Sequence, residues 1–321
     1  MKMRPRKKRW VFISLAVVIA MMFNSTAVFA SVDQVPEGIH GYYTYNAETG
    51  EEIYHDGREF APKSNAPLVE MSSPEYNPYG DSSPLSEITV SPNAIVGGED
   101  NRVKVANPKN NGAYRSIVCL TMYFESGIER GTGFIIGPKA VATAGHCLYD
   151  YENKEWATKV FVSPARAGYE HPYSTDTVTS SSSFEVGEEW KNSGKWEGDW
   201  GIIKLNKKFN TGWLGLKTQS SSYVGENAAI SGYPISAHGV DNNTVPYMYT
   251  DNGVITKDRG TQLLEYKIDA TKGQSGAPVR ANYSDTGYTA IAIHRGTEDF
   301  ADCNVGVRLY PWLYNKLVSY R

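Results

Sequence analysis

Three residues in this chain have the types, and stand in the motifs, that nucleophilic acyl transfer needs. His146 follows the run Ala-Thr-Ala-Gly, Asp199 opens the run Asp-Trp-Gly-Ile-Ile, and Ser275 lies in Gly-Gln-Ser-Gly-Ala-Pro. A serine hydroxyl is a poor nucleophile near neutral pH, so it needs a base to accept its proton and an acid to orient that base. The order histidine, aspartate, serine fits those roles. Gly273 adds an oxyanion hole, because its amide and that of Ser275 could both donate to a developing oxyanion.

The same serine could also belong to another class of hydrolase. Each motif alone is typical of an ordinary turn, and only the combination points to catalysis. The order Ser275, Asp285, His294 would suit an α/β-hydrolase. We reject it because these residues crowd within a few strands of the serine, and because Ala277 replaces the last glycine of the Gly-x-Ser-x-Gly elbow.

The first 30 residues have the three parts of a secretory signal peptide. Six Lys and Arg residues fall within positions 2–9, an apolar run extends from Trp10 to Phe23, and small residues end at Ala30. The apolar run is short for a membrane span and polar sequence follows it. We therefore expect residues 1–30 to be cleaved, and the protein to be secreted and extracellular, with no stable membrane anchor.

Residues 31–93 form a leader of different character. Acidic residues greatly outnumber the only basic ones, Arg58 and Lys63, and prolines and serines recur throughout. This composition predicts a loosely structured segment. We interpret it as a pro-segment that keeps an enzyme silent until export, and so as an intramolecular partner of the rest of the chain. The alternative is a disordered tail or linker.

Residues 94–321 contain many short β-rich runs separated by Gly, Pro, Asn and Ser. Such spacing predicts an all-β barrel or sandwich rather than alternating βαβ units. Only the end, 311–318, has helical spacing, with Trp312, Leu313 and Leu317 able to share one face.

Composition narrows the function further. The formal net charge of −3 gives no sign of a polyanion-binding surface, so we expect no nucleic-acid partner. No Cys-x-x-Cys or His-Glu-x-x-His motif occurs, and we expect no metal and no cofactor. The three cysteines, Cys119, Cys147 and Cys303, allow at most one intramolecular disulfide, and the sequence does not identify a pair.

Four segments, 133–147, 162–166, 230–234 and 273–278, resemble the bacterial glutamyl endopeptidases, the V8-like branch of the chymotrypsin-fold serine proteases. The resemblance implies an all-β, chymotrypsin-like double antiparallel β-barrel with a short C-terminal helix, the barrels spanning roughly 94–205 and 206–305. It also implies a secreted zymogen that cleaves protein or peptide substrates after Glu or, less well, Asp. We expect a monomer. The alternative class is an idle homologue that keeps the fold and acts as a binding protein.

The resemblance also implies a specificity pocket. His294 matches the family histidine that receives the substrate carboxylate. A threonine is usual five residues before the serine, where this chain has Ala270, so Thr271 is the candidate substitute. Lys272 would add positive charge at the pocket mouth. Asp269 supports an alternative, cleavage after Arg or Lys.

The start of the mature chain is expected near Ala94, in Ala-Ile-Val-Gly-Gly, which resembles the new N-terminus of activated trypsin-like enzymes. In those enzymes the freed amine pairs with an aspartate just before the nucleophilic serine. Gln274 stands there in this chain and cannot form that ion pair. In the V8-like branch the freed amino terminus helps to build the specificity pocket, so Ala94 is a candidate substrate-binding residue.

Overall fold

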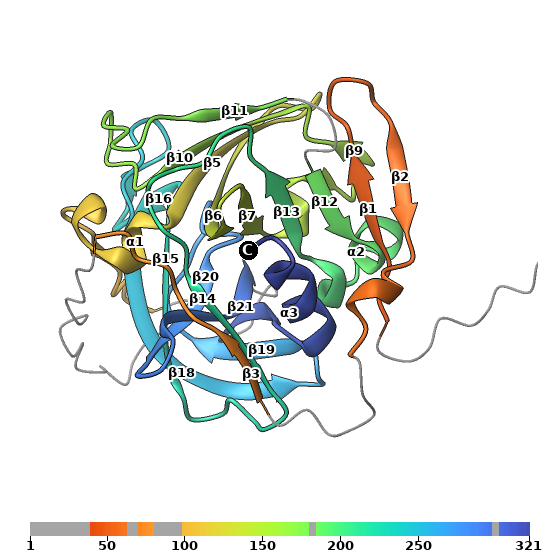
Figure 1. Cartoon of the computed structure of the whole chain (residues 1–321). Coiled ribbons are helices and arrows are strands. Elements are labelled where there is room, and N and C mark those ends of the chain that lie inside the picture. The colour runs from red at the N-terminus through yellow and green to blue at the C-terminus, as the bar shows by residue number, and fades with distance from the viewer. Residues whose placement is uncertain (1–38, 63–69, 80–97, 180–183, 297–301) are drawn as a thin grey trace, which may run out of the picture. The chain divides into compact units, whose positions relative to one another are not determined.

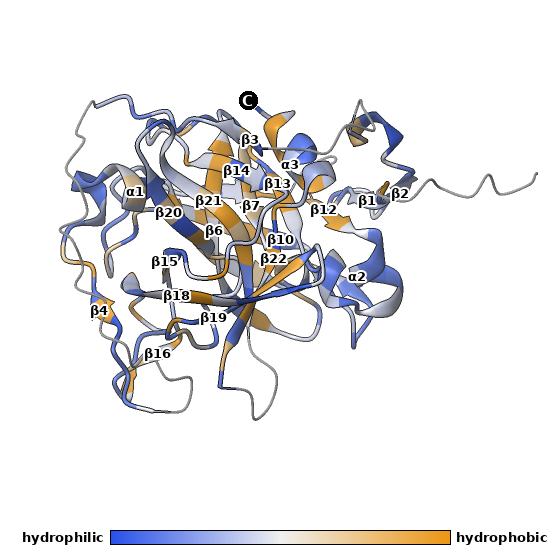
Figure 2. Cartoon of the chain, turned by 90° about the horizontal axis from the view of Figure 1, so that it is seen from below, coloured by the Kyte–Doolittle hydropathy of each residue, from blue (hydrophilic) through white to orange (hydrophobic). Residues whose placement is uncertain are grey.

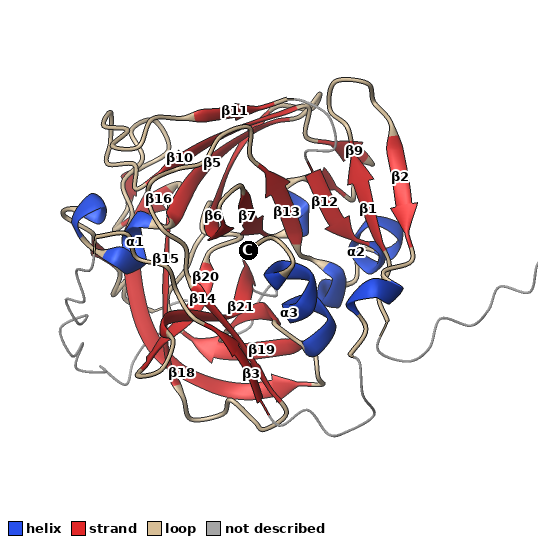
Figure 3. Cartoon of the chain, in the orientation of Figure 1, coloured by secondary structure: helices blue, strands red, loops and turns tan. Residues whose placement is uncertain are grey.

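The computed structural model describes residues 39–62, 70–79, 98–179, 184–296 and 302–321. The described chain is mostly β-structure arranged in two large sheets (Figures 1 and 3), which confirms the all-β prediction. Residues 1–30 and Ala94 lie outside the described residues. Within the described ranges, no helix is long and apolar enough to cross a membrane.

The first sheet carries the strands on either side of His146 and Asp199. Neighbouring strands of this sheet are antiparallel throughout the described residues. Its order is β11 (Asp176–Val178), β10 (Lys159–Pro164), β5 (Ile117–Tyr123), β6 (Ile128–Gly137), β7 (Ala140–Thr143), β13 (Gly201–Lys204), β12 (Phe184–Gly187), β1 (Tyr42–Tyr45) and β2 (Glu52–His55).

The second sheet carries Ser275 and His294. Its order is β20 (Pro278–Tyr283), β15 (Asn227–Gly232), β18 (Tyr249–Arg259), β19 (Leu263–Lys267), β22 (Asn304–Arg308), β21 (Gly287–Gly296), β14 (Gly215–Gln219) and β3 (Glu70–Ser73), with β4 (Val103–Lys104) paired to β18. Because β20 pairs with both β15 and β21, six of these strands close into a barrel. The β14–β21 pair is parallel.

Short elements complete the described chain. The small strands are β8 (Tyr149–Asp150) with β9 (Glu155–Trp156), and β16 (Ser236–Ala237) with β17 (Val240–Asp241). The helices are α1 (Gly112–Arg115), α2 (Glu188–Ser193) and α3 (Pro311–Val318), and the 3₁₀ turns are η1 (Arg58–Phe60), η2 (Pro108–Asn110), η3 (Gly145–Cys147) and η4 (Trp196–Gly198). The predicted C-terminal helix is therefore present as α3, and Trp312, Leu313 and Leu317 are all buried in it.

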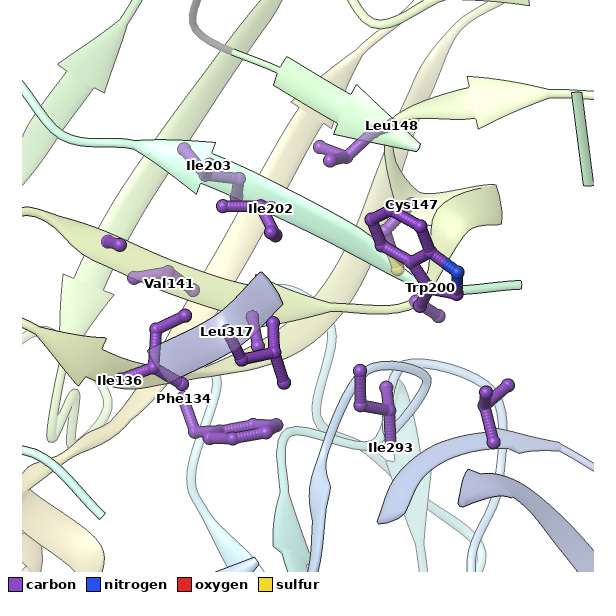
Figure 4. Packing of buried hydrophobic residues seen from close by; sticks show 14 of the residues in the cluster. Phe134, Ile136, Val141, Cys147, Leu148, Trp200, Ile202, Ile203, Ile293 and Leu317 are labelled. Carbon is purple, nitrogen blue, oxygen red and sulfur yellow. The ribbon is translucent and has the colours of Figure 1, made fainter. Parts of the chain in front are cut away.

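The main hydrophobic core lies under the first sheet and continues into α3 and part of the second sheet. Figure 4 shows Val141 and Ile202 from neighbouring strands packed near Leu317 of α3 and Ile293 of β21. In Figure 2 the hydrophobic colour concentrates on β7, β13 and β21, whereas α2 is mostly hydrophilic. Strands buried on both faces explain why β7 and β13 read as apolar runs instead of alternating patterns.

The described part of the leader differs from the loosely structured segment that we expected. Strand β1 pairs with β12 and with β2, and strand β3 pairs with β14, so the leader adds two strands to the first sheet and one to the second (Figure 1). Tyr42 and Thr44 alternate with less buried neighbours, which is the pattern of a half-buried strand. Glu52 accepts a hydrogen bond from Trp156 Nε1 at 2.7 Å and pairs with Lys191 at 2.9 Å. At least one acidic residue of the leader, Glu52, therefore contacts polar and basic side chains of residues 94–321.

Candidate active site

His146 is delivered by the end of β7. The strand leads into the 3₁₀ turn η3, whose second residue is His146, and this side chain is 30% exposed. Strand β13 pairs with β7 in the register Thr143 to Gly201. The segment just before β13 is therefore brought beside the segment just after β7. Asp199 lies two residues before β13 and His146 lies three residues after β7.

Asp199 is fully buried and its carboxylate accepts several hydrogen bonds. The Nδ1 atom of His146 lies 2.9 Å from Oδ2 and 3.1 Å from Oδ1, and the backbone N–H of His146 donates to Oδ1 at 2.8 Å. Arg295 Nε donates to Oδ2 at 3.0 Å. Burial alone would raise the pKa of Asp199, but the charges and hydrogen bonds of His146 and Arg295 outweigh it and lower that pKa. Asp199 is therefore an ionised acceptor that fixes the imidazole ring.

Ser275 lies in a tight turn just before β20. Gly273 and Gly276, on either side, have φ of 96° and 85°. A Cβ at position 276 would lie 2.1 Å from both Thr132 O and Thr143 Oγ1, so only glycine fits this turn. The Ser275 hydroxyl is 3.4 Å from the carbonyl of Arg295. Among the hydrogen bonds of the described residues, none joins this hydroxyl to His146.

Thr132 of β6 ties the serine turn to the first sheet. Its N–H donates to Ser275 O at 2.8 Å, its hydroxyl donates to Gly273 O at 2.8 Å, and the hydroxyl accepts from Tyr233 N at 2.9 Å. The turn is thus held from the sheet that carries His146. The sequence alone did not single out Thr132, since a threonine within a strand gives no sign of what lies across from it.

The amides proposed for the oxyanion hole have no competing acceptor. The N–H groups of Gly273 and Ser275 donate to no other atom of the described residues, whereas the neighbouring N–H of Gln274 donates to Thr271 O at 3.0 Å and that of Gly276 to His294 O at 2.7 Å. Two successive turns therefore leave alternate amides available, which is what binding an external oxyanion requires.

A cleft of about 520 Å³ opens beside these groups. It contains four of the predicted site residues, namely His146, Lys272, Gly273 and Ser275. No described residue of the leader lines it. The full lining is Met122, Phe124, Ser126, Glu129, Arg130, His146, Cys147, Asp150, Tyr151, Glu152, Asn153, Trp190, Lys272, Gly273 and Ser275.

His294 lies outside this lining and is only 2% exposed. Burial lowers the pKa of His294 to about 3, and the nearby His146 and Arg295 act in the same direction. Its Nδ1 atom is 2.8 Å from the hydroxyl of Tyr266, which is itself buried. The sequence did not point to Tyr266, because its partner is 28 residues away along the chain.

The other predicted pocket residues are committed to protein contacts. The hydroxyl of Thr271 accepts from Arg102 at 2.6 Å and donates to Ser236 O at 3.3 Å. Lys272 is exposed and pairs with Glu129 at 3.1 Å. Asp269 is 5% exposed, and its Oδ2 atom accepts from the backbone N–H of Asn101 at 2.8 Å. The carboxylate of Asp269 therefore holds the segment after position 98, which weakens the alternative of cleavage after Arg or Lys.

Cys119 and Cys147 are buried free thiols. A Cβ at position 131 would lie 2.9 Å from the sulfur of Cys147, so the site where a half-cystine could face Cys147 is occupied by Gly131. Figure 4 shows Cys147 within the core beside Trp200. Burial raises the pKa of the Cys147 thiol to about 12, so this sulfur acts as a small apolar group.

A double-sheet fold with an aspartate, a histidine and a serine at the sheet junction defines a chymotrypsin-fold serine endopeptidase. The chain belongs to the trypsin family, whose model matches residues 109–310.

The chain is 33% identical over 231 residues to a protein named glutamyl endopeptidase from Bacillus licheniformis, covering 70% of this chain and 68% of that one. It is 32% identical over 331 residues to a protein named extracellular metalloprotease from Bacillus subtilis, covering 99% and 98%. A solved Glu endopeptidase in complex with MPD superposes with a TM-score of 0.59 at 23% identity, covering 70% of this chain and 97% of that one. That last likeness shows the fold, and together the matches confirm the resemblance to glutamyl endopeptidases.

The name of the Bacillus subtilis relative raises the question of a metal. In the described part of this chain, no group of three or more His, Cys, Asp or Glu side chains is placed to hold a metal ion. His146 pairs with Asp199 instead, and Asp199 also accepts from Arg295. The donor groups of the described residues therefore do not fit a metal centre.

Proposed function

We propose that this endopeptidase works through an acyl-enzyme formed on Ser275, with His146 as the general base and Asp199 as the group that orients it. The contact of 2.9 Å between His146 Nδ1 and a buried, ionised Asp199 carries this proposal. It leaves Nε2 of the same ring to face the cleft that Ser275 lines. Rotation of the serine side chain away from Arg295 O would bring Oγ to that nitrogen.

The steps follow from these positions. Nε2 of His146 takes the hydroxyl proton as Ser275 Oγ bonds to the scissile carbonyl carbon, and the carbonyl oxygen becomes an oxyanion that accepts from the amides of Gly273 and Ser275. The C–N bond then breaks while Nε2 gives its proton to the leaving amine. A water molecule repeats the sequence, with His146 removing its proton, and releases the new carboxylic acid and the free Ser275.

We assign the preference for Glu, with Asp cleaved less well, to His294. Because the pKa of His294 is about 3, its ring is neutral at working pH and binds by hydrogen bonding instead of by charge. The buried hydroxyl of Tyr266 has no acceptor but His294 Nδ1 among the described residues, so the hydroxyl donates and the ring proton stands on Nε2. An Nε2–H donor suits a substrate carboxylate. Ala94, whose placement is not described, remains the proposed second contributor.

The exported zymogen remains part of the proposal. Signal cleavage near Ala30 and leader removal close to the Asn93–Ala94 bond are supported by the sequence pattern, and the Bacillus subtilis relative with the same extent carries the word extracellular in its name. Because the described leader residues lie away from the cleft, silencing through them would not work by plugging it. Its substrates would be exposed protein or peptide chains outside the cell.

Hydrolysis of matched peptides that differ only in Glu, Asp, Gln, Lys or Phe before the cleaved bond tests the proposal. We expect Glu to be cleaved fastest, and Tyr266→Phe to reduce the preference for Glu over Gln. A phosphonate ester should label Ser275 in the wild type and not in Ser275→Ala. Faster cleavage after Lys would contradict the specificity. Loss of activity to a chelator, with no labelling of Ser275, would contradict the mechanism.

A further inference from the structure

Arg102 is a buried arginine that contacts the turn before the candidate nucleophile. It precedes β4, which pairs with β18. Arg102 is 3% exposed, and its Nη1 atom donates to Gln274 Oε1 at 2.7 Å and to Thr271 Oγ1 at 2.6 Å. Two of its hydrogen bonds therefore end on the four residues that run up to Ser275.

The remaining donors of Arg102 are also used. Nε and Nη2 donate to the two carboxylate oxygens of Asp100 at 2.8 and 2.7 Å, and Nη2 also donates to Ser236 O at 3.2 Å. All five N–H groups of the guanidinium thus have an acceptor. The hydrogen bonds to Arg102 lower the pKa of Asp100, so the charge of the arginine is balanced within its own segment.

Gln274 converts this contact into a constraint on the turn. Its Oε1 atom also accepts from Thr271 N at 3.0 Å, while its own N–H donates to Thr271 O at 3.0 Å. The side chain is fully buried, and its Nε2 atom has no hydrogen-bond partner among the described residues. Leaving a buried amide donor unpaired is unfavourable, so the orientation is set by the donors that meet Oε1, one of which is charged.

We infer that Arg102, acting through Gln274 and Thr271, positions the turn that presents the oxyanion amides of Gly273 and Ser275, and that it does so without a free amino terminus. The inference rests on the proposed role of Ser275. Trypsin-like enzymes would use a new terminal amine on an aspartate at the place of Gln274. Here the cation is an internal side chain and its counter-ion is Asp100. The turn is already formed in the chain that still carries its leader. Removal of the leader would then change only the specificity pocket.

Arg102→Ala in the full-length and the processed enzyme tests this role against a merely structural one. Arg308→Ala is the matched control, because Arg308 is also buried, contacts Asp258 and the carbonyls of Gln219 and Ser221, and touches nothing in the turn. The readouts are kcat, KM and the inhibition constant of a peptide aldehyde, whose tetrahedral adduct places an oxygen in the oxyanion hole.

We expect Arg102→Ala to lower kcat and aldehyde affinity about 100-fold with little change in KM, as for loss of an oxyanion donor. Added guanidinium ion should restore part of kcat. Arg308→Ala should lower the melting temperature and leave both constants near the wild type. If Arg102→Ala does not fold, Thr271→Val removes one of the two contacts and should lower kcat to a smaller extent. Acetylation of the processed amino terminus should leave aldehyde affinity unchanged.

Equal kcat and aldehyde affinity in Arg102→Ala and Arg308→Ala would overturn the inference, as would loss of aldehyde affinity on acetylation. Phosphonate labelling separates the two levels of proposal. If the wild type is not labelled at Ser275, the proposed mechanism itself fails. If the wild type and Arg102→Ala are labelled at the same rate, only the role of Arg102 fails.

Discussion

One arginine lies at each end of the candidate site, Arg295 beside Asp199 and the buried Arg102 beside the serine turn, and the two differ in what they contact. Arg295 donates directly to the carboxylate of Asp199, so its charge lies next to the acid that faces the imidazole. Arg102 has its charge balanced by Asp100 and offers the serine turn only hydrogen bonds, to the neutral groups of Gln274 and Thr271. The first contact therefore helps to keep Asp199 ionised, whereas the second can set only the geometry of the serine turn.

Asp199→Asn should lower kcat more than the other substitutions, because it removes the negative charge that lies next to the imidazole of His146. The amide would present a hydrogen-bond donor toward His146 or Arg295, and the imidazole would lose the acceptor that fixes its tautomer. We expect kcat to fall about 10⁴-fold. Asp258→Asn is a matched control, since Asp258 also pairs with an arginine but lies away from the cleft. A fall in kcat smaller than about tenfold would contradict the role of Asp199.

Thr132→Val tests whether the hydrogen bonds from β6 set the geometry of the serine turn. It deletes the hydroxyl that donates to Gly273 O and accepts from Tyr233 N, while keeping side-chain volume. We expect unfolding free energy to fall by about 1–3 kcal/mol, and kcat to fall about tenfold or more because the oxyanion amides shift. Thr289→Val deletes another buried hydroxyl in the second sheet and should lower stability alone. Equal kcat in the two variants would show that the turn needs no anchor on β6.

Arg295→Gln should shift the pH profile more than the maximal rate. The charged groups facing His146 are Asp199 and, through it, Arg295, while His294 is neutral. The charge of Arg295 is one of the causes that lower the pKa of Asp199, so removing that charge lets the Asp199 carboxylate take up a proton at higher pH. The acid limb of kcat/KM should move up by about one pH unit, equivalent to about 1.4 kcal/mol. Arg295→Lys should keep the wild-type limb, and an unmoved limb in both variants would contradict the charge effect.

Lys272→Gln should have the smallest effect. Lys272 is exposed at the cleft and pairs with Glu129 across solvent, a geometry that contributes about 0–1 kcal/mol. We expect kcat/KM for a Glu peptide to fall less than about fivefold. That difference should shrink as salt is added. A larger, salt-resistant loss would mean that Lys272 contacts the substrate directly and, like Arg295, acts through its charge.

The sequence singled out the candidate reacting groups more fully than the residues that contact and position them. His146, Asp199, Gly273 and Ser275 could be selected because acyl transfer demands those residue types and because their motifs are local. The fold class followed from short β-rich runs, and α3 from the spacing of Trp312, Leu313 and Leu317. These features depend on neighbours in the chain, which a single sequence displays.

The supporting residues depend on contacts that no local pattern reveals. Arg102 meets Gln274 across 172 positions and Arg295 meets Asp199 across 96, and nothing around either arginine distinguishes it from a surface residue. Thr271 illustrates the converse. Its hydroxyl made it a candidate for the pocket, yet the hydroxyl is engaged by Arg102. The leader was misjudged because its prolines and acidic residues obscured β1 and β3, whose stability comes from pairing with strands far along the chain.

The pairing of β1 with β12 has a consequence for handling the protein. Strand β12 has β13 on one side and β1 on the other, so departure of the leader would leave a row of unpaired N–H and C=O groups along β12. Such an edge can recruit a strand from another molecule. Processed enzyme at high concentration should therefore self-associate more readily than the full-length chain, and its storage life should depend on whether the severed leader is kept in the same solution.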